Sequence, residues 1–371
     1  MILANLLILL IIVGCVVYQY LKGTLVRSFV MIISAVCAGI IAFGYFELIA
    51  NLLIKRGKLV NWAQPLSFLL LFALIFAILE TITIQLMRKP IDFGFLPERI
   101  GRIVGGILSG IIISGLLLTA FAMTPLSNKL PYQRFDDRNP LADRPQKVLL
   151  NADGLVSGLF SIVSGGSFSG ERSFALVHPD FLDQVFLNRA NIKKVSILTG
   201  NNKAIEVPRP AVWPATDGLK DSRDPNIPIE PKSGYNLTFV RMGIKKFALK
   251  DAGKFTLSQL RVICRQKNVA GKATAKGINI YPFGYLKTQD QLQTKKLNEM
   301  IEITNKDFGR NQNVKWVDFA FNVPNNYQPV LIEFKQNNIA ELPLPVSTEK
   351  APPPEPFEKK SKKKKKSSAK P

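Results

Sequence analysis

Four long apolar segments occupy the first third of the chain, and they constrain its fold more than any other feature. They run over residues 2–20, 25–54, 65–87 and 100–123, and charged side chains are sparse in all four. A helix of about 20 apolar residues is long enough to cross a bilayer. The first segment lacks the basic start and the cleavage site of a signal peptide, so we expect it to be retained. Because the loops are short, the sequence predicts an all-α membrane domain of four antiparallel helices over residues 1–125.

Basic residues in the loops predict the orientation of these helices. Cytoplasmic loops carry an excess of Lys and Arg. The first and third loops contain six such residues and the second contains three: Lys22, Arg27, Arg88, Lys89, Arg99 and Arg102 against Lys55, Arg56 and Lys58. Three further basic residues follow the fourth segment and count against this assignment, although a large domain has less influence than a short loop. We expect loops one and three in the cytoplasm and both termini outside.

The remaining two thirds of the chain reads as a soluble protein. Residues 126–145 are polar and predict a linker, and residues 146–192 predict a short helical connector. In this connector, residues 148–163 have apolar side chains at helical spacing, which suits a helix on the membrane surface or, with more weight, an ordinary packing helix. Residues 179–189 predict a second short helix that follows His178.

Residues 193–342 predict a mainly β soluble domain of the antiparallel sandwich or small-barrel type. Runs rich in β-branched and aromatic residues alternate with Pro, Gly, Asn and Asp. We expect strands at 194–199, 235–242, 255–266, 277–286, 314–323 and 329–335, and one helical interruption at 292–306. Residues 317–335 weakly resemble the final hairpin of exported immunoglobulin-like domains. Residues 343–371 contain prolines and then lysines, which predicts a disordered tail.

Five glycines in the fourth apolar segment predict a packing surface. Residues four apart lie on one face of a helix. Two adjacent stripes result, one of Gly101 and Gly105 and the other of Gly106, Gly110 and Ser114. Small residues let helix backbones approach closely in lipid, where a hydrophobic drive is missing. We favour packing within the four-helix domain over a homo-oligomer seam, and two stripes leave room for both.

The order of short motifs in residues 1–125 resembles the colicin V production (CvpA) family of bacterial inner-membrane proteins. The matching residues form a basic turn, an acidic-Arg pair and spaced glycines: Lys22, Gly23, Arg27, Glu98, Arg99, Gly106 and Gly110. Glu98 stands where the family usually has Asp, and Arg102 takes the first glycine position. The resemblance covers about a third of the chain. It implies a multi-pass protein of the inner membrane with a role in toxin production or export and in envelope homeostasis.

Two carboxylates in the apolar segments are candidates for function. Glu80 lies within the third segment, where a charge is costly and marks a functional site by default. Arg88 is about two turns further on, so snorkelling or pairing with a basic residue explains Glu80 more simply. The alternative is a small transport or channel subunit, assembled through the glycine-rich helix, with Glu80 near the pathway. Glu47, close to the end of the second segment, is expected at the membrane interface.

The residue inventory argues against catalysis. The chain has one histidine, His178, and three cysteines, Cys15, Cys37 and Cys264. This excludes most zinc and haem sites, and no nucleotide-binding or serine-hydrolase motif occurs. The HPD sequence at 178–180 lacks the preceding basic helix of a chaperone J-domain, so we expect an ordinary surface histidine. The sequence predicts a non-enzymatic protein with no cofactor and no metal.

The charge of the chain points to an anionic partner. The net charge is +22, and a run of lysines, Lys362–Lys366, lies near the C-terminus. Each lysine near an anionic membrane contributes about 1 kcal/mol of binding. No aromatic residues are interleaved with these lysines, so we expect no specific nucleic acid as a binding partner. The expected partners are the bilayer, an anionic lipid or envelope polymer at the lysine run, and a ligand of the β domain.

Overall fold

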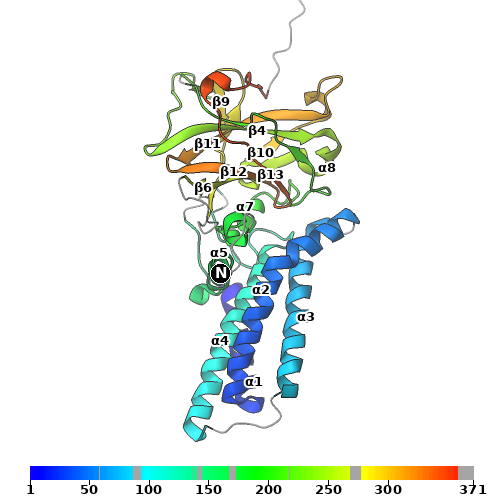
Figure 1. Cartoon of the computed structure of the whole chain (residues 1–371), viewed down its shortest axis with the longest axis vertical. Coiled ribbons are helices and arrows are strands. Elements are labelled where there is room, and N and C mark those ends of the chain that lie inside the picture. The colour runs from blue at the N-terminus through cyan, green and yellow to red at the C-terminus, as the bar shows by residue number, and fades with distance from the viewer. Residues whose placement is uncertain are drawn as a thin grey trace, which may run out of the picture.

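Four long helices form a bundle, and a mainly β domain lies at one end of it (Figure 1). The computed structural model describes residues 1–57, 59–86, 93–136, 138, 140, 144–166, 173–216, 218–267 and 277–357. The helices are α1 (Ile2–Lys22), α2 (Leu25–Lys55), α3 (Ala63–Leu86) and α4 (Phe95–Ala122). The short helix η1 (Val60–Trp62) precedes α3. All four predicted membrane helices are therefore confirmed as elements, and the fold class is the predicted one.

The surface of the bundle is suited to lipid. Each of the four helices is long and apolar enough to cross a membrane. Large apolar side chains on their outer faces are exposed rather than packed, among them Leu6, Leu10, Phe29, Leu48, Leu70 and Leu74. An exposed apolar belt of this size is typical of a membrane or partner surface, because soluble monomers rarely carry one. The chain is thus a membrane-embedded protein, and its described residues include four helices that can span the membrane.

α2 is longer than a membrane crossing requires, and its end belongs to the junction with the β domain. Its 31 residues extend about 46 Å, against about 30 Å for the hydrocarbon core. Ala50 and Ile54 near its C-terminal end pack against Ile197 and Leu198. A strand was predicted at 194–199, and this prediction is wrong. The segment forms turns instead, because its apolar side chains cover the end of α2.

The β domain is a sandwich of antiparallel sheets, as predicted. The first sheet has the order β1-β4-β11-β8-β9-β3 with β2 also on β4, the second is β13-β12-β6-β7, and β5 pairs with β10. Its strands are β1 (Ile205–Glu206), β2 (Val212–Pro214), β3 (Lys220–Asp221), β4 (Tyr235–Lys245), β5 (Lys254–Thr256), β6 (Leu260–Gln266), β7 (Ile278–Ile280), β8 (Gly284–Leu286), β9 (Gln291–Thr294), β10 (Met300–Glu302), β11 (Val314–Pro324), β12 (Tyr327–Phe334) and β13 (Asn338–Glu341). Only β3 and β9 pair in parallel among these strands.

Long pairing between β4 and β11 builds the main layer of the sandwich. The two strands stay in register from Tyr235 to Lys245, opposite Pro324 to Val314. Their inner side chains, such as Met242 and Phe319, meet Val262 and Phe334 from the second sheet in one buried core. Alternation of inward and outward side chains along paired strands is what produces such a core.

One prediction in the β domain is wrong. Residues 292–306 were expected to form a helix, but they contain most of β9 and all of β10, which pair with β8 and β5. Tertiary strand pairing outweighs the helical propensity of this stretch. Residues 317–335 were compared with a hairpin, but β11 and β12 lie in different sheets. The chain crosses from one layer to the other after Pro324. The immunoglobulin-like resemblance stays a prediction.

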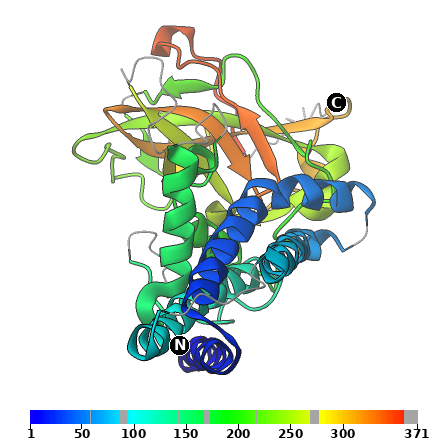
Figure 2. The same ribbon diagram turned by 60° about the horizontal axis from the view of Figure 1, so that its bottom comes forward.

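Short helices connect the bundle to the β domain. They are η2 (Leu149–Asn151), α5 (Ala152–Gly165), α6 (Phe174–Val177) and α7 (Phe181–Asn188), while η3 (Lys246–Ala248), α8 (Leu249–Ala252), η4 (Leu257–Gln259), η5 (Asn305–Asp307) and η6 (Thr348–Lys350) lie within the domain or after it. α5 crosses the end of the bundle beside α2 (Figure 2). The Phe160 ring occupies the space that a side chain at Gly39 would fill. Ala152 and Val156 do the same at Gly115. α5 is therefore a packing helix, although Leu155 and Ile162 stay exposed.

Arg189 fastens the connector to the end of α4. Its guanidinium is buried and donates to the backbone carbonyls of Ala122, Leu126, Ser127 and Leu130 at 2.5 to 2.9 Å. Burial lowers the pKa of Arg189 to about 10. A cation is favourable at a helix C-terminus, where carbonyls lack intrahelical partners. The Arg189 side chain thus contacts three carbonyls at the start of the predicted linker.

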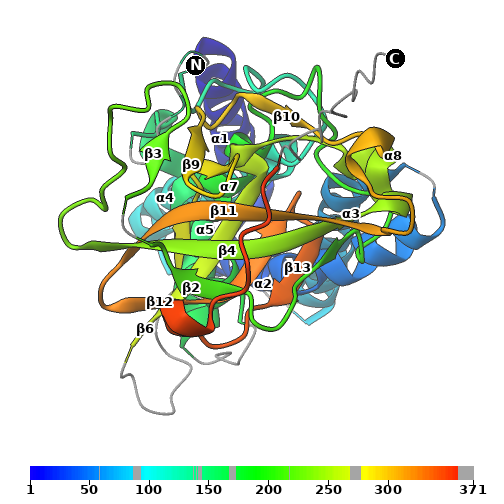
Figure 3. The same cartoon turned by 90° about the horizontal axis from the view of Figure 1, so that it is seen from above.

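The described chain continues beyond the predicted boundary of the β domain. Residues 343–357 cross β4 and β11 on the outer side of the sandwich (Figure 3). Arg241 binds the Asp318 carboxylate through two nitrogens, at 2.6 and 2.7 Å, and also donates to the carbonyl of Pro353. The ring of Phe357 lies on Tyr285. The lysine run Lys362–Lys366 lies outside the described residues.

Candidate functional site at the junction of the membrane helices and the β domain

A buried polar network joins α2 to the second sheet. Glu47 of α2 and His178 lie 2.9 Å apart, measured from Oε1 to Nε2. The other ring nitrogen, Nδ1, is 2.8 Å from Oε1 of Gln184 on α7. Gln184 donates to Glu333 of β12, and Glu333 pairs with Arg261 of β6. This chain of contacts connects a membrane helix, the connector and the β sandwich through charged side chains and the amide of Gln184.

The central pair of this network is fully enclosed. The side chains of Arg261 and Glu333 are 3% and 2% exposed. Arg261 also reaches Nδ1 of His178 at 3.3 Å and donates to Asn279. Burying charges is unfavourable unless they are paired and hydrogen-bonded. Such a network is costly if incomplete, so it favours one arrangement of the β domain on the bundle.

His178 is therefore buried, and the predicted surface histidine is wrong. The ring is only 3% exposed and lies against Phe174 and Phe181. Phe43 and Phe46 of α2 extend this aromatic cluster. No local sequence pattern indicates this burial, because the partner Glu47 is far away along the chain. Glu47 was expected at the membrane interface, and its side chain here belongs to the junction.

The charge of His178 predicts that the junction is sensitive to pH. Burial lowers the pKa of His178, but the Glu47 carboxylate raises it and Glu333 adds to this, against Arg261, so that the pKa lies above its ordinary value of 6.5. A raised pKa means that the folded state binds the proton more tightly than the unfolded state does. Protonation of His178 therefore stabilises the fold fully below pH 6.5, and this contribution is lost as pH rises through the raised pKa.

As pH rises from 6.5 through the raised pKa of His178, we expect the melting temperature of the full chain to fall. In the His178→Gln variant the melting temperature should depend less on pH over the same range. Because the chain has one histidine, its imidazole NMR signals can be assigned without ambiguity and titrated directly. A histidine signal that titrates below pH 6.5 would contradict the Glu47 contact.

The opposite end of the bundle brings the two motif regions together. Glu98 at the start of α4 accepts a hydrogen bond from the backbone N–H of Leu25 at 3.0 Å, and it also pairs with Arg102 at 3.1 Å. The Leu25 N–H is the first unpaired donor of α2, so Glu98 acts as a cap supplied from another helix. Thr24 caps the same turn from within, through the N–H of Arg27.

Other motif residues lie around this cap. At Gly23 an added Cβ would meet the Gln19 side chain at 2.1 Å, so the turn has no space for a larger residue. Lys22 is exposed and its carbonyl lies 3.5 Å from Arg27. Arg99 is exposed on α4, with its guanidinium 4.1 Å from the ring centre of Phe95. Arg99 therefore does not join the contact that Glu98 makes.

The glycine stripes of α4 face two different helices. A Cβ at Gly106 or Gly110 would lie 2.6 or 2.7 Å from the Cα atoms of Val16 or Ile12 on α1. At Gly101 and Gly105 it would meet Leu25 and Ser28 of α2 at 2.7 and 2.5 Å. Ser114 is buried and donates to the carbonyl of Ile111. Each stripe thus packs against another helix of the same bundle.

Glu80 lies near a basic residue other than the one expected. Its Oε1 atom is 3.4 Å from Arg27 of α2, and Arg27 also donates to the hydroxyl of Tyr18 at 2.9 Å. Arg88, the expected partner, lies outside the described residues. Arg27 also contacts the Lys22 carbonyl, so Glu80 belongs to the polar cluster at the loop end of the bundle. The pairing gives the intramembrane carboxylate a structural role.

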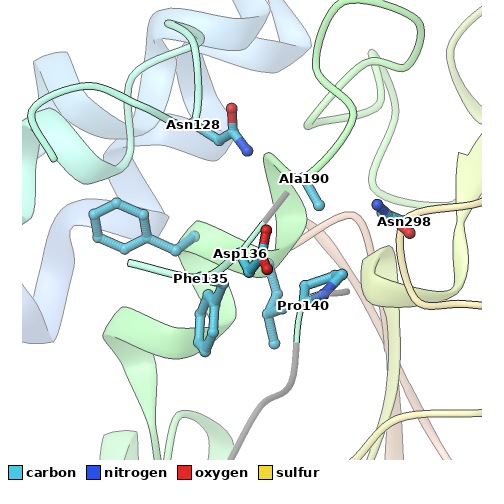
Figure 4. Close-up of a pocket in the computed structure, with 8 residues that line it drawn as sticks. Asn128, Phe135, Asp136, Pro140, Ala190 and Asn298 are labelled. Carbon is cyan, nitrogen blue, oxygen red and sulfur yellow. The ribbon is translucent and has the colours of Figure 1, made fainter. Parts of the chain in front are cut away.

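Two further features are not candidates for binding or catalysis. Burial lowers the pKa of Lys335 to about 7, but its ammonium donates to the backbone carbonyls of Asp251 and Lys254 and holds a turn. A cavity beside the linker, between Asn128, Asp136 and Asn298, is shown in Figure 4. Its volume of about 10 Å³ suits one water molecule. Within the described residues, no cluster of three or more His, Cys, Asp or Glu is placed to hold a metal ion.

Comparison of the chain with protein-family models, with characterised proteins and with solved structures finds no match. Fold and junction together define a class: a membrane-embedded four-helix protein that carries a β sandwich on one end of its bundle.

Proposed function

We propose that this chain is a non-enzymatic membrane protein of the CvpA type, with a role in toxin production or export and in envelope homeostasis. The membrane helices hold the β domain on the extracytoplasmic side of the bacterial inner membrane, where it binds its ligand. The helix bundle is also suited to partner helices or a second copy. The lysine run Lys362–Lys366 is the proposed contact with an anionic lipid or envelope polymer.

The hydrogen bond from the Leu25 N–H to Glu98 carries this proposal. The family resemblance rests on two separate motifs, the basic turn after α1 and the acidic-Arg pair that opens α4. Contact between them gives the motif pair a common physical purpose, because the carboxylate caps the helix that the turn begins. Glu and Asp both supply this acceptor together with a negative charge, which is favourable at a helix N-terminus.

Complementation tests the proposed role. In a colicin V-producing bacterium that lacks its own CvpA protein, we expect expression of this chain to restore toxin release. Glu98→Asp should retain this activity, because a carboxylate still faces Leu25, whereas Glu98→Ala should reduce it severalfold. Membrane levels of both variants are measured in parallel. No restoration by the unmodified chain, at normal membrane levels, would contradict the proposal.

The transport alternative receives less support from the contacts of Glu80. Its pairing with Arg27 supplies a charge partner at the loop end of the bundle, as expected for a structural carboxylate. A change of solute flux in Glu80→Gln, with the bundle intact, would favour the transport subunit instead.

A further inference from the structure

A cavity of about 580 Å³ lies between the membrane helices and the β domain, next to the polar network. Its walls come from α2, α5, the α6 region and the edge of β12 and β13. Most of its lining is apolar, with Ile40, Ile41, Phe43, Gly44, Phe160 and Val163 toward the bundle. This volume is in the range of about 300–1,000 Å³ that is usual for small-molecule sites.

The cavity spans the depth at which a lipid changes from acyl chain to head group. Counted from the start of α2 at 1.5 Å per residue, Ile40 lies about 22 Å and Glu47 about 33 Å along the helix axis, against about 30 Å for the hydrocarbon core. Tyr45 and Leu48, on the same stretch of α2, are exposed, as is Ile162 of α5. The apolar half of the cavity is therefore at acyl-chain depth, and its polar half is at the membrane surface.

The polar end of the cavity has groups that suit a head group. The Glu47 side chain lines the cavity, is 35% exposed and uses Oε1 toward His178. The Ser173 hydroxyl also lines it, is buried and has no hydrogen-bond partner. Such an unsatisfied buried hydroxyl is uncommon and calls for a partner. The pairs of Glu47 with His178 and of Arg261 with Glu333 cancel in charge, so a head group without net charge fits best.

We propose that this cavity binds a zwitterionic, amine-bearing membrane lipid. The ammonium group donates to the Glu47 carboxylate, a phosphate or ester oxygen accepts from the Ser173 hydroxyl, and one acyl chain lies between α2 and α5. An anionic head group without an amine would face Glu47 unfavourably. A choline head group has the right charge but no N–H to donate. The site is independent of the role in toxin production.

Gly44 allows a direct test. A Cβ at Gly44 would meet no heavy atom within 4 Å, although the residue lines the cavity. Gly44→Leu should therefore fill the cavity without straining α2, and helix propensity favours leucine over glycine. Gly14 on α1 is also free of neighbours within 4 Å and does not line the cavity. Gly14→Leu is thus a matched control for the same change on a lipid-facing helix.

Native mass spectrometry of the full chain in detergent measures lipid retention. Dioleoyl phosphatidylethanolamine, phosphatidylglycerol and phosphatidylcholine are offered separately at equal concentration. We expect retention of one phosphatidylethanolamine, a loss of about tenfold or more in Gly44→Leu because the side chain takes the place of the acyl chain, and no loss in Gly14→Leu. Glu47→Gln should reduce the preference for phosphatidylethanolamine over phosphatidylcholine.

Equal retention of the three lipids, or unchanged retention in Gly44→Leu, would show only bulk lipid and overturn the proposal. A preference for phosphatidylglycerol would do the same. Because the readout is binding to purified protein, failed complementation of toxin release does not affect this result, and a failed lipid test leaves the proposed function standing.

Discussion

Gly106→Leu is expected to disrupt the membrane domain. A Cβ at this position already lies 2.6 Å from the Cα of Val16 and 3.0 Å from its backbone nitrogen. These are backbone atoms of another helix and cannot rotate away, so α1 and α4 must separate. Overpacking of a well-packed core costs about 1–3 kcal/mol of stability and occasionally more. Because the two helices must separate along their contact, we expect a loss at the upper end of this range. Gly110→Leu meets Ile12 in the same way.

Fluorescence-detected size-exclusion chromatography of detergent extracts measures the folded, monodisperse fraction. We expect a severalfold loss for Gly106→Leu and Gly110→Leu. Gly14→Leu is the control, since it has the same gain in helix propensity and no close neighbour. Normal folding of either α4 variant would contradict the contact between the stripe and α1.

Arg261→Met is expected to destabilise the junction strongly. The variant leaves the Glu333 carboxylate buried at 2% exposure without its cation. Removal of one partner of a buried ion pair costs about 3–5 kcal/mol. For a domain of this size each kcal/mol corresponds to about 2–4 °C, so the melting temperature of the full chain should fall by about 10 °C.

A double variant separates charge from packing. Arg261→Met combined with Glu333→Gln removes both charges, and the amide oxygen can still accept from Gln184. We expect this pair of changes to restore more than half of the lost stability, because the penalty comes from the uncompensated charge. Thermal unfolding of the single and double variants measures this recovery of stability. If the double variant were no more stable than Arg261→Met alone, the ion pair would not be the stabilising feature.

The membrane helices could be predicted from the sequence because their signal is local. A run of apolar residues of sufficient length determines a membrane helix by itself, and the spacing of Gly106 and Gly110 shows that they share a face. The identity of the neighbouring helix is not local information. Only the structure shows that this stripe faces α1 and that Gly101 and Gly105 face α2.

The junction could not be predicted for the same physical reason. His178, Glu47, Arg261 and Glu333 come from four separate segments, and none of them has a local pattern that indicates burial. The long strands β4 and β11 were predicted from their β-branched and aromatic residues, while the short strands β9 and β10 were missed. Short strands depend on their pairing partners, which sequence propensity does not contain.

A topology fusion measures directly on which side of the membrane the β domain lies. Alkaline phosphatase and green fluorescent protein are fused in turn after Pro371 of the full chain and expressed in a bacterium. Alkaline phosphatase is active only outside the cytoplasm, and green fluorescent protein exported in unfolded form does not fluoresce. We predict an active phosphatase fusion and a dark fluorescent-protein fusion. An inactive phosphatase beside a bright fluorescent protein would place the β domain in the cytoplasm and contradict the proposed extracytoplasmic location.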